Sequence, residues 1–199
     1  MPLLVAFATM IEAEATIALY KAAPLKAGRL FKCSLGHIVI TGIGNLAACQ
    51  AVTEYACLAD AIVNFGVAGG LRPELTIGAT HMAAVTAKHF SIPAYCDSHA
   101  HQFAAQTQPA IQLANEGLRL VSSDYPINHN DLQQTLGLSY DLVDMEGYGV
   151  AFAARQAGLP CQIWKTVSDF ASPSSPAEIR ARLQGLSKTI AAQTQILLN

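Results

Sequence analysis

The chain has 199 residues, of which 52% are hydrophobic and 13% are charged, and its formal net charge is −2. This is enough apolar material for one buried core, so we expect a single domain over residues 1–199. Without a run of Lys or Arg, the chain offers no basic surface for a phosphate backbone, which excludes nucleic acid as an expected partner. The charged fraction of 13% is about half of the roughly 25% that is typical of globular chains. The protein surface should therefore be weakly polar, and we expect a second copy of the chain to cover part of it in a homodimer.

The apolar stretches are interrupted by Gly, His or charged residues well before the roughly 18 residues that a membrane span requires. The first apolar run also lacks the basic start and the small-residue cleavage site of a signal peptide. We therefore expect a cytoplasmic protein with no membrane partner.

Apolar runs alternate with helical segments along the chain. Strands are predicted over residues 3–8, 38–40, 61–65, 80–87, 118–122, 142–145 and 161–167. Helices are predicted over residues 11–22, 46–58, 147–156 and 176–198. The last helix has the clearest start, because Ser175 is a good N-cap, Pro176 suits the first helical position and Glu178 completes a capping box. This alternation predicts an α/β fold with a mixed sheet between helices on both faces.

Two segments are not regular in this pattern. Residues 66–70 hold three glycines and are predicted to form a tight turn that something packs against. Residues 88–110 have no clear period and are predicted to be a loop or flap. Cys96, His99 and His101 in that segment lack a second ligand pair, so we expect no metal ion.

Three acids follow apolar runs, at positions where the carboxyl ends of strands would meet. They are Glu12, Glu146 and Asp169. Each has a plain structural alternative, since acids favour the first turn of a helix and Asp is a common cap. Three acids at one sheet edge would repel one another and raise pKa values, however, and carboxylates in unequal environments suit general acid and base chemistry.

Five stretches, in order along the chain, resemble the purine nucleoside phosphorylase and nucleosidase superfamily, and within it the methylthioadenosine/S-adenosylhomocysteine nucleosidases. They are residues 8–12, 41–44, 63–71 (VNFGVAGGL), 143–147 (VDMEG) and 166–172 (TVSDFAS). Each match alone is weak, but five ordered matches are specific. The resemblance implies a three-layer α-β-α fold with a central, mixed and partly barrel-like sheet.

The resemblance also implies roles for the three acids. Glu12 would position and deprotonate the attacking water, Glu146 would hold the ribose hydroxyls, and Asp169 would donate a proton towards N7 of the base. These residue types fit the chemistry, because a purine anion is a poor leaving group and protonation at N7 is worth about 10² to 10⁴ in rate. A carboxylate near the sugar also stabilises an oxocarbenium-like transition state.

Further residues are expected to bind substrate. Met145 would lie under the sugar and Tyr125 would stack on the base, although plain core packing explains both equally well. The other expected contacts are Val67, Ala68, Gly69 and Ser168. Val67 departs from the family, which usually has Ser or Thr there, and the chain has deletions relative to typical members around residues 28–34 and 88–105. The resemblance implies that those two regions shape the pocket for the 5′ substituent, so the identity of the substrate stays open.

The sequence thus predicts hydrolysis of a purine nucleoside, with adenine as the expected base and without an organic cofactor or metal. Three alternatives remain: phosphorolysis, hydrolysis of the hypoxanthine nucleoside futalosine, and nucleoside binding without catalysis. Against phosphorolysis, no Arg stands soon after the first strand or just before residues 66–70. An arginine fork is the usual holder of a phosphate dianion.

Overall fold

The computed structural model describes residues 1–90, 108–127, 129–171 and 176–198. Its strands are β1 (Leu3–Phe7), β2 (Ala23–Lys26), β3 (Leu30–Cys33), β4 (Gly36–Ile40), β5 (Ala61–Gly70), β6 (Thr80–Lys88), β7 (Ile111–Gln112), β8 (Leu118–Ser122), β9 (Leu142–Asp144) and β10 (Cys161–Asp169). Its helices are α1 (Met10–Leu19), α2 (Asn45–Tyr55), the 3-10 turn η1 (Ala56–Leu58), α4 (Asn130–Gly137), α5 (Gly147–Gln156) and α6 (Pro176–Leu198).

One mixed sheet runs through the molecule, and part of it closes on itself. The strand order is β10-β6-β8-β9-β5-β1-β4-β3-β2, and β10 also pairs with β5. The strands β5, β10, β6, β8 and β9 therefore form a closed ring, while β1 to β4 extend from β5 as an open sheet. The partly barrel-like sheet expected from the sequence is confirmed.

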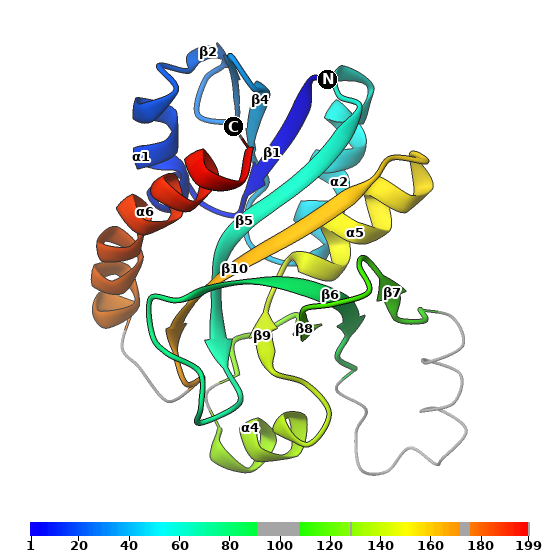
Figure 1. The fold of residues 1–199 in the computed structure, drawn as a ribbon, viewed down its shortest axis with the longest axis vertical. Coiled ribbons are helices and arrows are strands. Elements are labelled where there is room, and N and C mark those ends of the chain that lie inside the picture. The colour runs from blue at the N-terminus through cyan, green and yellow to red at the C-terminus, as the bar shows by residue number, and fades with distance from the viewer. Residues whose placement is uncertain (91–107, 128, 172–175, 199) are drawn as a thin grey trace.

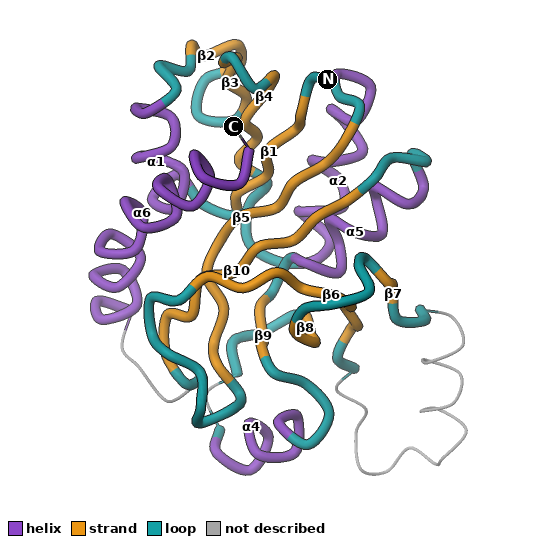
Figure 2. Tube along the Cα trace, in the orientation of Figure 1, coloured by secondary structure: helices purple, strands orange, loops and turns teal. Residues whose placement is uncertain are grey.

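Helices cover both faces of the open part of the sheet, as Figure 1 and Figure 2 show. The alternation of β1 explains this arrangement. Leu4 and Ala6 pack in a core with residues of α2 and α5, whereas Val5 and Phe7 pack on the other face with residues of α1 and α6. Because successive side chains of a strand point to opposite faces, a wholly apolar strand needs a cover on each side. The three-layer arrangement is thus also confirmed.

The glycine-rich stretch does not form the predicted turn. Residues 66–70 continue β5, and they pair with β10 on one side and with β9 on the other. The glycines serve close packing instead. A Cβ atom on Gly66 would lie 3.0 Å from Oε1 of Glu12, and one on Gly69 would lie 3.0 Å from the Cβ atom of Ala171. The prediction was right that something packs against this stretch and wrong about its backbone.

Other differences are local. The hairpin of β2 and β3 and the helix α4 were not predicted, and α1 ends at Leu19 rather than near residue 22. Most of the predicted flap, residues 91–107, lies outside the described residues, as does Ser175 of the predicted capping box. Glu178 does stand in the first turn of α6.

Candidate active site

A cavity of about 340 Å³ opens where β1, β5, β9 and β10 end. All the residues that the sequence predicts for the site line this cavity. Their chemical roles stay predictions. These residues are Glu12, Val67, Ala68, Gly69, Tyr125, Met145, Glu146, Ser168 and Asp169. Residues distant in the sequence meet here because the strands that precede them end at one edge of the sheet.

Glu12 is buried at the start of α1, with 3% of its surface exposed. Its Oε2 atom accepts hydrogen bonds from the backbone N–H of Thr9 at 2.9 Å and from the Thr9 hydroxyl at 2.8 Å. Its Oε1 atom accepts the backbone N–H of Val67 at 3.1 Å. Thr9 and Glu12 form a capping box, so the structural alternative for Glu12 holds as well. The same bonds fix the carboxylate at the cavity wall.

Glu146 is also buried, at the N-terminus of α5. Its Oε1 atom accepts the backbone N–H of Gly44 at 2.9 Å. Gly44 has φ +101, a conformation that side-chain-bearing residues rarely adopt. Burial, and then the charge of Asp144, raise the pKa of Glu146 to about 7, against the lowering effects of Lys165 and of the Gly44 N–H. Among the three predicted acids, only Glu12 adds to this rise, and it does so least of the causes, so the raised pKa of Glu146 is mainly an effect of burial and of Asp144 rather than of the predicted repulsion.

Asp169 ends β10 and is more accessible than the other two acids. Its Oδ2 atom accepts the Ser168 hydroxyl at 2.7 Å and lies 3.2 Å from Nη1 of Arg182. Its Oδ1 atom accepts the backbone N–H of Ala171 at 2.7 Å. Ala171 has φ +50, so the backbone bends sharply just after the acid.

The sequence reading missed a buried ion pair behind the acids. Lys165 is 1% exposed, and its ammonium lies 2.8 Å from Oδ2 of Asp144. Burial lowers the pKa of Lys165, but the carboxylates of Asp144 and Glu146 outweigh it and hold that pKa above the usual value. Asp144 also accepts bonds from the Ser122 hydroxyl and from the backbone N–H of Gly147. A charged residue in the middle of a predicted strand was the available signal.

The reading also missed Arg182 on α6, which lines the cavity beside Asp169. No local pattern links it to the acid, because the two residues meet only through the packing of α6 against the end of β10. Among the described lining residues, Arg182 is the basic one.

The described residues contain no group of three or more His, Cys, Asp or Glu side chains placed to hold a metal ion. Cys96, His99 and His101 lie outside them. No helix in the described part of the chain is both long and apolar enough to cross a membrane.

The fold and the cavity together define a class, that of α/β proteins with an acid-lined cavity at the strand ends. The model of the phosphorylase superfamily matches residues 4–198, and the chain belongs to that family. A comparison with curated protein sequences finds no match.

Solved structures share this fold at low sequence identity. The native futalosine hydrolase of Helicobacter pylori has a TM-score of 0.81 and 20% identity, over 98% of this chain and 96% of that one. The 5′-methylthioadenosine/S-adenosylhomocysteine nucleosidase of Helicobacter pylori, with butyl-thio-DADMe-Immucillin-A, has a TM-score of 0.81 and 20% identity, over 98% and 97%. The S-adenosylhomocysteine nucleosidase of Streptococcus pyogenes, with 5-methylthiotubericidin, has a TM-score of 0.79 and 21% identity, over 100% and 94%.

Proposed function

We propose that this protein hydrolyses the N-glycosidic bond of a purine nucleoside. The observation that carries the proposal is the convergence of Glu12, Glu146 and Asp169 on one cavity, each held by at least one backbone N–H. The superfamily and the nucleosidases and hydrolase that share the fold support the same reaction.

In this proposal Glu12 is the general base that orients and deprotonates water. The bonds from Thr9 and Val67 fix both of its oxygens, so the carboxylate needs little reorganisation when the reaction begins. Asp169 is the general acid that protonates N7. Departure of the neutral base then leaves an oxocarbenium-like sugar, which water attacks.

Glu146 accepts hydrogen bonds from the ribose hydroxyls and stabilises the positive charge that develops on the sugar. Met145 lies beneath the sugar and Tyr125 stacks on the base, which fits the 37% exposure of Tyr125 at the cavity. The remaining contacts come from the walls of the cavity, formed by Val67, Ala68, Gly69 and Ser168.

Water is a better nucleophile here than phosphate. A phosphate dianion beside Glu12 would be repelled by about 4 kcal/mol per unit charge pair at about 4 Å, at an effective dielectric of about 20. Arg182, the basic residue of the described cavity wall, is paired with Asp169 rather than placed beside Glu12, so it does not offset this repulsion. Lys165 is paired with Asp144.

We further propose a cytoplasmic homodimer that acts in nucleoside catabolism, with methionine salvage as the pathway if the substrate is methylthioadenosine. The low charged content supports a dimer, as do Ile43 and Leu46, apolar side chains near the cavity that are 62% and 83% exposed. Sedimentation at micromolar concentration should give twice the chain mass of 21.0 kDa, and a monomer would refute the dimer.

Base release tests the reaction. Methylthioadenosine, S-adenosylhomocysteine, futalosine and 5′-methylthioinosine are incubated with the protein with and without phosphate, and the products are separated by chromatography. We expect free base and free pentose from at least one substrate without phosphate. Strict dependence on phosphate with a pentose 1-phosphate product favours phosphorolysis, and binding without base release favours the silent nucleoside-binding protein.

A further inference from the structure

Arg182 brings a guanidinium to the acid that we assign to N7 of the purine. Its Nη1 atom lies 3.2 Å from Oδ2 of Asp169, with 31% of the Arg182 side chain and 25% of the Asp169 side chain exposed. Arg182 lines the active-site cavity together with Ile179 and Leu183 of the same helix. The pair is therefore within reach of a base bound at Asp169.

The position of Arg182 relative to the other acids indicates which part of the base it meets. A second cavity, of about 410 Å³, shares Ser168, Asp169 and Arg182 with the first, but neither Glu12 nor Glu146 lines it. Asp169 and Arg182 thus lie together where the two cavities join, away from Glu12 and Glu146 at the end assigned to the ribose. In a purine the sugar is on N9, so beyond N7 on that side stands the substituent at position 6.

Purines differ at this edge in their hydrogen-bonding groups. A 6-oxopurine presents two acceptors, N7 and O6, whereas adenine presents the N7 acceptor and the N6 amino donor. A guanidinium has five N–H donors and no acceptor. Arg182 can therefore bond both Asp169 and O6, but it meets the amino group of adenine donor to donor.

Asp169 offers adenine little compensation. Its Oδ2 atom, on the side of Arg182, already accepts bonds from Ser168 and Arg182. Its Oδ1 atom accepts the N–H of Ala171. The second lone pair of Oδ1 carries the proton that Asp169, as the general acid, donates to N7. An N6 amino group would have to displace one of these donors.

We propose that Arg182 makes the site selective for a 6-oxopurine, of the hypoxanthine or guanine class, over adenine. The inference rests on the proposed function and changes the base expected from the sequence. It assigns Arg182 as a specificity-determining residue of the same cavity.

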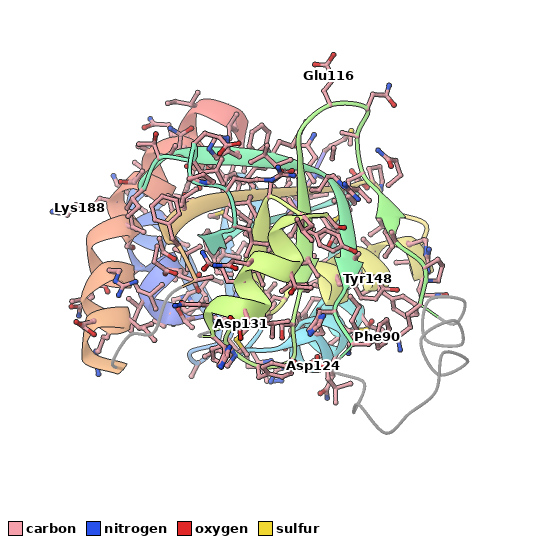
Figure 3. All side chains as sticks on the ribbon, turned by 90° about the horizontal axis from the view of Figure 1, so that it is seen from below. Phe90, Glu116, Asp124, Asp131, Tyr148 and Lys188 are labelled. Atoms are coloured by element: carbon pink, nitrogen blue, oxygen red, sulfur yellow. The ribbon has the colours of Figure 1, made fainter. Side chains whose placement is uncertain are left out.

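The test uses two substrates that differ only in the 6-oxo or 6-amino form of the base, 5′-methylthioinosine and 5′-methylthioadenosine. We expect the wild-type protein to favour the inosine compound in kcat/KM by at least about fivefold, the lower end of the range for a good base contact. Arg182→Met should bring the ratio close to one, and Arg182→Lys should keep part of the preference because it retains a donor. Lys188→Met is the matched control, since Lys188 points outward from the same helix (Figure 3).

A preference of the wild-type protein for adenine would overturn the inference, as would an Arg182→Met variant in which both rates fall equally and the ratio is unchanged. The second result would make Arg182 an anchor of α6 only. If neither base is released, the proposed function fails, but calorimetry with free hypoxanthine and adenine still tests Arg182. Tighter hypoxanthine binding that Arg182→Met abolishes supports the inference, and equal binding of the two bases contradicts it.

Discussion

The acid at the start of α1 and the acid at the end of β10 line the same cavity, but the protein holds them in different ways. Glu12 is buried and is fixed by Thr9 and by the backbone of β5. Asp169 is partly exposed and is held by a side chain from α6, an element outside the sheet. The part assigned to the attacking water is thus fixed by the sheet and its first helix. The part assigned to the base is held by its own strand end and, in addition, by Arg182 of α6.

The largest effect on the rate of base release is expected at Glu12, the acid that the sheet and α1 hold in place. Glu12→Gln should lower base release at the upper end of the about 10² to 10⁴ range for general base catalysis, because it removes the base. Nucleoside binding, measured by calorimetry, should persist, since Gln keeps the size and most hydrogen bonds of Glu. The control is Glu14→Gln on the exposed face of the same helix, which should behave as wild type. Loss of binding together with activity would make Glu12 structural.

At the exposed end of the site, Asp169→Asn should slow release of a purine by about 10²-fold or more, because the proton donor is lost. The fold should stay intact, since Asn keeps the size of the side chain and the lost ion pair with Arg182 is partly exposed. A nitrophenyl riboside sharpens the comparison, since its leaving group needs no protonation. Its cleavage by the variant should stay close to the wild-type rate. A fully active variant on purine nucleosides would refute the role of Asp169 as the acid.

The buried ion pair of Lys165 and Asp144 is expected to affect the stability of the protein. Lys165→Met leaves Asp144 buried without its cation and should lower the free energy of unfolding by about 3 to 5 kcal/mol, measured by urea denaturation. Lys165→Arg should retain most of the stability. Adding Asp144→Asn to the Met variant should restore part of the loss, because no unpaired charge then remains. Unchanged stability of Lys165→Met would show that the pair does not support the site.

A smaller effect is expected from pH. Because the pKa of Glu146 is raised to about 7, its carboxylate form prevails above that pH and the protonated form below it. The carboxylate is the form that accepts two ribose hydroxyls, so KM should rise as the pH falls below about 7, by up to about tenfold per unit. Glu146→Gln should bind weakly at all pH values. A wild-type KM that does not change between pH 5 and 8 would contradict this role.

Much of the fold and the three acids could be predicted because their signals are local. β1 is a wholly apolar run, and each of the three acids follows a strand that the sequence predicts. The hairpin of β2 and β3 was missed because β2 is short, exposed and contains Pro24. The glycines of β5 mimic a turn, since their packing partners Glu12 and Ala171 are remote in sequence. Lys165 and Arg182 act through tertiary contacts, which a single sequence does not reveal.

The most direct test of the account is the origin of the new oxygen on the sugar. The protein is incubated with 5′-methylthioinosine or 5′-methylthioadenosine in phosphate-free, ¹⁸O-enriched water. The released pentose is reduced at once, which stops oxygen exchange at C1, and its mass is then measured by mass spectrometry. Hydrolysis with Glu12 as the base predicts free base and a pentose carrying one ¹⁸O atom. No turnover until phosphate is added, followed by an unlabelled pentose 1-phosphate, would contradict it.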